Sequence, residues 1–137
     1  MDILETLKKN GHRITSARRN VIASFSSGCN PVTAQEVHVQ LRKKGFSPNV
    51  TTVYRELQFL TEQGLLRTIQ FDDGVARYEL ADGHHHHHLV CIRCKAVDEI
   101  EMDHDIDSLE QQIAKQKNFA VQRHSLEFYG LCSKCGA

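Results

Sequence analysis

The sequence lacks an excess of charge of either sign, and it lacks a long apolar run. Its 17 basic and 17 acidic residues cancel to a formal net charge of zero, so any surface that attracts nucleic acid has to be local. No apolar stretch approaches the roughly 20 residues that cross a bilayer, and Met1-Asp2-Ile3 does not begin a basic-then-apolar signal pattern. We therefore expect a cytoplasmic protein of one or two small domains with no membrane partner.

Metal-ligating side chains are plentiful by contrast. Two Cys-x-x-Cys pairs, Cys91 with Cys94 and Cys132 with Cys135, amount to the ligand set of a closed tetrahedral zinc site. Their wide separation predicts a metal that joins distant parts of a domain. A redox or disulfide role is the alternative, which a reducing compartment disfavours. Cys29 is left over, and we interpret it as a small hydrophobic residue.

Five consecutive histidines, residues 84–88, precede the first cysteine pair. Successive side chains of a strand point to opposite faces, so His86 and His88 face one way and His85 and His87 the other. One strand thus supplies imidazoles to two separate metal sites. An expression tag is the alternative reading, but the run is short, internal and followed by an apolar segment.

The first 81 residues show helical periodicity followed by a hairpin signal. We expect helices over 2–10, from Thr15 to about 25, from Thr33 to Gly45 with Glu36 completing a capping box, and from Thr51 or Thr52 to about 63. Two β-prone runs, 66–71 and 76–80, flank Asp72-Asp73-Gly74. This order predicts a winged helix, a relative of the helix-turn-helix DNA-binding module.

The helix before the wing is the one that enters the major groove in such a module. Its predicted exposed face carries side chains suited to base edges and phosphates: Thr51, Thr52, Tyr54, Arg55 and Gln58. Three further cations near the second helix are candidates for phosphate contact: Arg13, Arg18 and Arg19.

A polar break at 82–83 is the expected hinge between a DNA-binding domain, 1–81, and a metal-binding dimerisation domain, 84–137. The second domain is predicted to contain strands at 89–92, 97–102 and 119–129 and a helix at 106–117. The fold class is therefore α+β, with a winged helix followed by a small α/β domain. Its small sheet favours pairing with a second copy of the chain.

Several motifs together resemble the ferric uptake regulator superfamily of metal-responsive repressors. They are GHRITSAR at 11–18, TVYREL at 52–57, the histidine run before Cys91, HSL at 124–126, and the closing Cys-x-x-Cys. The resemblance covers nearly the whole chain. It implies a homodimer that binds a palindromic operator in double-stranded DNA, with metal at the hinge setting the angle between the two DNA-binding arms.

The resemblance also implies three metal sites. The structural Zn(II) site matches Cys91, Cys94, Cys132 and Cys135. The regulatory hinge site matches Glu79, His86, His88 and Glu99, with Glu101 as an alternative to Glu99. A further site matches His85, His87, Asp107 and His124. His84 and His104 are expected to be solvent-facing.

The chain departs from the family pattern at Pro31, where a further hinge histidine is usual. His12, His38, Cys29 or a water molecule are the candidate substitutes. Glu79 resembles iron-type members and the all-histidine run resembles zinc-type members. We expect Fe(II) slightly ahead of Zn(II) as the regulatory ion, with Mn(II) as a third option.

The predicted function is thus a metal-dependent transcriptional repressor of metal homeostasis, with no small-molecule substrate. A peroxide- or haem-responsive regulator of the same superfamily is the first alternative. A zinc hydrolase is a second, but the sequence lacks a His-Glu-x-x-His pattern. Metal storage by the histidines without DNA binding is a third, against which the winged-helix half argues.

Overall fold

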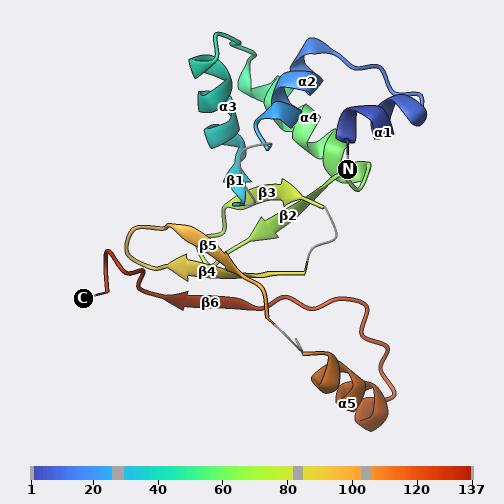
Figure 1. Cartoon of the computed structure of the whole chain (residues 1–137), viewed down its shortest axis with the longest axis vertical. Helices are drawn as coiled ribbons and strands as arrows, with labels where there is room; N and C mark the ends of the chain where they lie inside the picture. The colour runs from blue at the N-terminus through green and yellow to red at the C-terminus, as the bar shows by residue number, and fades with distance from the viewer. Residues whose placement is uncertain (1, 26–29, 82–84, 103–105, 137) are drawn as a thin grey trace. The chain divides into compact units, whose positions relative to one another are not determined.

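The computed structural model describes residues 2–25, 30–81, 85–102 and 106–136. The chain forms two compact units, Met1–His84 and His85–Ala137, and each is considered by itself (Figure 1). The hinge predicted at 82–83, together with Cys29, His84 and His104, lies outside the described residues. The α+β class is confirmed, because helices and two small sheets make up the two units. Across the described ranges, no helix has the length and apolar character required to span a bilayer.

Each helix of the first unit begins at a polar side chain that accepts hydrogen bonds from the first turn. Thr33 and Glu36 form the predicted capping box, in which Glu36 N lies 3.1 Å from Thr33 Oγ1 and Thr33 N lies 2.7 Å from Glu36 Oε2. The cap predicted at Thr51 or Thr52 is wrong, because Asn49 begins that helix and accepts from Thr52 N at 3.0 Å. The helices are α1 (Ile3–Lys9), α2 (Ser16–Ala23), α3 (Ala34–Lys43) and α4 (Val50–Glu62).

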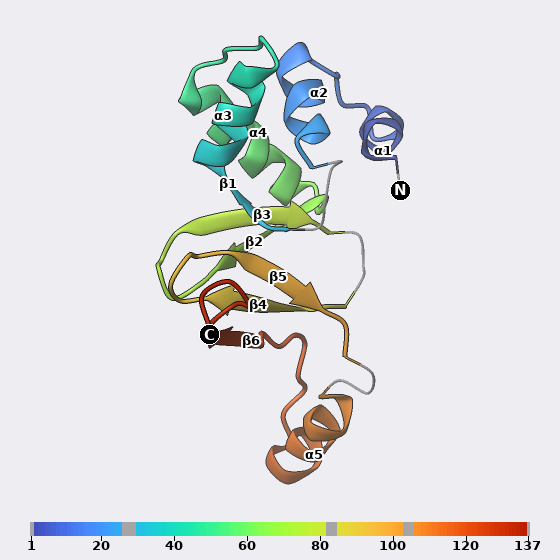
Figure 2. The same cartoon turned by 60° about the vertical axis from the view of Figure 1, so that its left-hand side comes forward.

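The predicted hairpin is confirmed and forms two strands of a three-stranded sheet. Strands β2 (Leu66–Gln70) and β3 (Ala76–Leu80) pair antiparallel, and Gly74 supplies the positive φ of 69° that their turn requires. A short strand that the sequence did not indicate, β1 (Val32–Thr33), pairs with β3 on its other side. In Figure 2 the helices α2, α3 and α4 lie together on one side of this sheet.

The core of the first unit is apolar and comes from all four helices. The side chains with almost no exposure are Leu7, Val21, Val37, Leu41, Val53, Leu57 and Leu60. Helix α4 contributes three of them at the spacing of one helical face, as the sequence predicted. Its opposite face is thereby left toward solvent.

In the second unit, residues 85–102 and 106–136 form a three-stranded sheet and one helix. Strand β4 (His87–Cys91) is central, with β5 (Val97–Ile100) antiparallel on one side and β6 (Glu127–Gly130) parallel on the other. Helix α5 (Asp107–Lys117) buries none of its residues, and both views draw it apart from the strands.

The prediction of a strand over 119–129 is wrong for most of its length. Only Glu127–Gly130 joins the sheet, while Phe119 is 61% exposed and so does not belong to a buried strand face. Strand β4, by contrast, begins two residues before the predicted Leu89 and thereby includes two histidines. That earlier start sets the geometry of the metal-ligating residues.

Candidate metal centres and nucleic-acid interface

The four paired cysteines lie at the ends of two neighbouring strands. Cys91 is the last residue of β4, and its strand partner in β6 is Gly130, just before the turn that carries the second pair. The turn containing Cys94 is closed by Lys95, which has a positive φ of 64° and donates its N–H to Cys91 O at 3.0 Å. The parallel pairing of β4 with β6 therefore brings two segments that are distant in sequence to one place.

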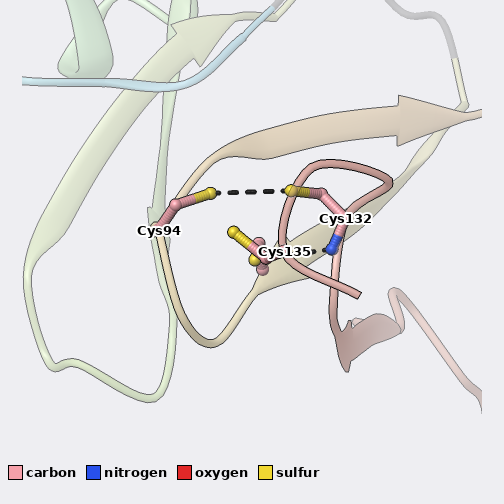
Figure 3. Close-up of side chains that lie close together, drawn as sticks. Cys94, Cys132 and Cys135 are labelled. Carbon is pink, nitrogen blue, oxygen red and sulfur yellow. Dashed lines mark hydrogen bonds between the residues drawn. The ribbon is translucent and has the colours of Figure 1, made fainter. Parts of the chain in front are cut away.

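The geometry of this cluster fits a tetrahedral zinc ion. None of the four cysteines is in a disulfide, and their sulfurs lie within 4.8 Å of one another. Cys94 Sγ and Cys132 Sγ are 3.7 Å apart, and Figure 3 shows Cys94, Cys132 and Cys135 turned toward one another. A tetrahedron with Zn–S bonds of about 2.3 Å has S–S edges of about 3.8 Å. The donor set and spacing are those of a closed structural site.

Proton affinities differ within the cluster. The pKa of Cys91 is lowered to about 6, because backbone N–H groups donate to its sulfur, first that of Cys94 and then that of Cys132. The pKa of Cys132 is also lowered, mainly by the backbone N–H of Lys134. The pKa of Cys135 is raised to about 12, chiefly because its thiol is hydrogen-bonded to the Cys132 sulfur. Part of the cluster is thus prepared as thiolate, the form that binds metal.

A second cluster within the same unit contains His85, His87 and His124, with one donor atom of each within 4.8 Å of the others. Nε2 of His85 and Nε2 of His124 are 3.1 Å apart, close to the edge of about 3.4 Å expected between two imidazoles on one zinc ion. The predicted separation of the histidines by strand face agrees with the ring contacts, which join 85 to 87 and 86 to 88. Asp107, the fourth residue implied by the resemblance, is not in the cluster.

Glu110, which is absent from the predicted ligand set, contacts this cluster instead. Its Oε1 lies 2.7 Å from His124 Nδ1, on the far side of the ring from the nitrogen that faces His85. A carboxylate accepts, so the tautomer that suits this contact has its proton on Nδ1 and leaves the lone pair of Nε2 for a metal ion. Such an acceptor fixes the ring of a metal-bound histidine. The signal for it was present in the sequence, since Glu110 follows Asp107 at helical spacing and lies on the same face of α5.

The residues predicted for the regulatory hinge site belong to both units. Within the second unit, His88 pairs in register with Glu99, and His86 Nε2 lies 3.8 Å from Glu99 Oε2. The rings of His86 and His88 are 5.0 Å apart. Glu79 belongs to strand β3 of the first unit, is 2% exposed, and forms an ion pair with Arg67, its register partner on β2.

The candidates for the missing hinge histidine are engaged within the first unit. His12 Nε2 lies 2.9 Å from Gln63 Oε1, and the His12 ring meets Phe59 edge-on at 5.1 Å. His38 Nε2 lies 2.9 Å from Pro48 O. Each imidazole therefore already has a polar partner on another segment of its own unit.

The solvent face of α4 carries most of the predicted DNA-contacting residues. Tyr54 is 52% exposed, and the residues at positions 51, 54, 55 and 58 recur at the spacing of one helical face. Thr52 is partly withdrawn from that face, because its hydroxyl and its N–H both donate to Asn49 Oδ1. Gln58 is exposed and donates to Glu62 at 3.0 Å.

The three predicted phosphate-binding arginines are placed differently. Arg13 and Arg19 are exposed, and within residues 2–25 and 30–81 neither forms an ion pair; the same holds for Arg55. Arg18 is turned into the domain, where its Nε donates to Glu56 Oε2 at 2.8 Å. Its predicted role as a phosphate ligand conflicts with this placement. No local pattern indicates the contact, because the partner lies on another helix.

Comparison with known proteins gives matches along nearly the entire chain. The sequence model described as the Ferric uptake regulator family matches residues 9–129. A ferric uptake regulation protein of Bacillus subtilis is 34% identical over 137 residues, covering 97% of this chain and 91% of that protein. One from Cupriavidus metallidurans is 37% identical over 129 residues, covering 93% and 90%. The crystal structure of the Vibrio cholerae ferric uptake regulator superposes with a TM-score of 0.83 at 32% identity, covering 96% of this chain and all of that one.

Proposed function

Because this chain belongs to the ferric uptake regulator family of metal-dependent transcription regulators, we propose that it is a repressor that binds an operator when a regulatory divalent ion is bound. The observation that carries the proposal is the combination of two features in one chain. The first unit is a winged helix whose α4 presents an exposed polar face, and the second unit holds preformed clusters of metal-ligating side chains. Family membership also places the chain among regulators rather than enzymes, which disfavours the zinc-hydrolase alternative.

The donor sets suggest different tasks for the sites. Four cysteines offer a closed shell of thiolates to zinc, which suits a structural role and leaves no open position. The proposed regulatory set consists of His86, His88 and Glu99 with Glu79 of the first unit, and these residues offer mixed imidazole and carboxylate donors. Such a set suits Fe(II), Zn(II) or Mn(II). Fe(II) is favoured because the similar proteins of B. subtilis and C. metallidurans are named ferric uptake regulation proteins.

The proposed mechanism is thermodynamic linkage. An ion that takes ligands from both units favours one arrangement of the DNA-binding unit over others, at a coupling of about 1–3 kcal/mol. DNA that fits this arrangement tightens metal binding by the same factor, because the coupling is reciprocal. Glu79 is the proposed ligand from the first unit. Its buried carboxylate is paired with Arg67, so in binding an ion it would interact with both cations.

A homodimer supplies the two arms that a palindromic operator requires. Support for it comes from the second unit, which exposes large apolar side chains on its helix, its strands and the segments beside them. They are Ile92, Ile100, Met102, Leu109, Phe119, Phe128, Tyr129 and Leu131. Helix α5 buries no residue in the single chain, so a second copy is the partner that this surface suits.

The test is DNA affinity under anaerobic conditions. Protein with zinc at the four paired cysteines is loaded in turn with Fe(II), Mn(II) or Zn(II). Its binding to an operator selected from random-sequence duplexes is then measured. We expect one ion to tighten binding about tenfold or more, and Glu79→Gln to abolish that gain. Glu5→Gln, a matched change at an exposed position on α1, should leave it intact. Equal affinity with every ion and with none would refute metal-dependent repression.

A further inference from the structure

Arg18 links the second helix to the helix that faces DNA in a winged-helix module. It lies in the first turn of α2, and its side chain is only 13% exposed, against 14% for its partner Glu56 on α4. The guanidinium carbon stands 3.7 Å from the centroid of the Phe59 ring. Glu56 and Phe59 are one helical turn apart, so one cation engages a carboxylate and an aromatic face on the same side of α4.

The same guanidinium also holds the turn between α1 and α2. Arg18 Nη1 donates to the carbonyl oxygen of Arg13 at 2.7 Å. A second tie runs from the same turn to α4, because His12 contacts Gln63 and the edge of Phe59. The turn that carries Arg13 is thus connected to α4 at two points. A planar guanidinium makes such forked contacts in fixed directions, which an ammonium group does not.

This placement is unsuited to a phosphate ligand. To reach DNA, Arg18 would have to leave Glu56, and a half-buried carboxylate would then lie unpaired beside the polyanion. Arg13 and Arg19, on either side in sequence, are exposed and free of ion pairs within the described part of the first unit. The side chains available for DNA are therefore the neighbours of Arg18 rather than Arg18 itself.

We infer that Arg18 is a positioning residue for DNA recognition. It holds the turn bearing Arg13 and the start of α2 against α4, so that the phosphate-binding cations and the base-facing residues Tyr54 and Arg55 keep a fixed relative placement. It also neutralises Glu56, which adjoins Arg55 in sequence. This inference rests on the proposed DNA binding and concerns which residues touch the nucleic acid.

The salt dependence of binding separates a positioning residue from a phosphate ligand. Each phosphate contact contributes about 0.9 to the slope of log affinity against log salt concentration. The full-length, metal-loaded protein is titrated between roughly 50 and 200 mM salt with the selected operator and with unrelated duplex DNA. We expect Arg19→Met, the matched control, to reduce the slope by about 0.9. Arg18→Met should leave the slope unchanged and lower the ratio of specific to non-specific affinity by roughly tenfold.

Arg18→Lys provides an independent readout that does not depend on removing the charge. Lysine serves as a point-charge phosphate ligand, so a direct DNA contact would survive this change. A positioning role would not, because lysine loses the fork that joins Glu56 to Arg13. We therefore expect Arg18→Lys to lose specificity as Arg18→Met does. Thermal unfolding shows whether each variant is folded at the assay temperature. If Arg18→Met is unfolded at that temperature, the result for Arg18→Lys decides whether Arg18 is a positioning residue.

A double-mutant cycle completes the test. If Arg18 acts through Glu56, the specificity lost in Arg18→Met with Glu56→Ala should be less than the sum of the two single losses. A reduced slope in Arg18→Met, together with wild-type specificity in Arg18→Lys, would overturn the inference and leave the proposed function standing. A wild-type protein that selects no sequence from the duplex pool would overturn both.

Discussion

Replacing Glu110 tests the geometry of the three-histidine cluster. Its carboxylate is 2.7 Å from His124 Nδ1, and the two side chains are 28% and 16% exposed, so the contact is only partly screened by water. Loss of an acceptor behind a ligating histidine typically weakens metal binding 10- to 100-fold, which is about 1.4–2.7 kcal/mol. With the partner partly exposed, we expect Glu110→Ala to fall near the lower figure, about tenfold. The physical reason is that the His124 ring then divides its population between tautomers and orientations.

The assay requires that only this cluster binds the added ion. His86→Ala with His88→Ala removes the neighbouring donors, while the four cysteines keep their zinc. Affinity for Co(II) is then measured by competition with a chelator, following the visible absorption of the bound ion. Glu110→Ala is compared with Gln111→Ala, the next position on α5, which should bind as the parent does. Nitrogen chemical shifts of the His124 ring report the tautomer directly, and we expect the Nδ1–H form to predominate only when Glu110 is present.

Asp107→Asn supplies the result that would refute this reasoning. The resemblance assigns Asp107 to the site, whereas the structure brings Glu110 to His124. A loss of about tenfold in Co(II) affinity in Asp107→Asn, with no loss in Glu110→Ala, would show that Asp107 and not Glu110 is the carboxylate of this site.

Three further outcomes follow from the same structure. Leu57→Ala, at a fully buried position of α4, should lower the free energy of unfolding by about 2–5 kcal/mol in urea titrations, whereas Val39→Ala at a 42% exposed position should cost far less. Cys132→Ser should release zinc, measured by elemental analysis, and remove the cooperative thermal transition of the second unit, because the ion joins the ends of β4 and β6. Cys135 has a pKa of about 12 and Cys91 a pKa of about 6. Zinc binding to the four cysteines should therefore displace a proton from Cys135 at any pH below about 12, and a proton from Cys91 as well at any pH below about 6. Zinc affinity should therefore fall with decreasing pH, more steeply below about pH 6, and calorimetry in buffers of different ionisation enthalpy counts the protons.

Local sequence was sufficient for the features that depend on neighbours along the chain. The capping box at Thr33, the turn at Gly74 and the buried stripe of α4 each involve residues a few positions apart. The cysteine pairs and the alternation of the histidines were predictable for the same reason. The cap of α4 was misplaced because several polar residues precede that helix, and only the backbone conformation of Asn49 decides among them. The strand expected over 119–129 failed because apparent alternation without a buried face does not order a strand.

Tertiary structure decided the roles that depend on residues far apart in sequence. Arg18 and Glu56 are separated by 38 positions in the sequence. The residues next to either one do not distinguish an arginine that binds a carboxylate on another helix from one that would bind DNA. Glu110 rather than Asp107 meets His124 because the turn of α5 and the path of the following segment fix which carboxylate reaches the ring. The sequence by itself determined which residues are candidates for metal binding and which helical face is buried. Their individual partners were determined by packing, since a hydrogen bond is formed only where the fold brings donor and acceptor within about 3 Å.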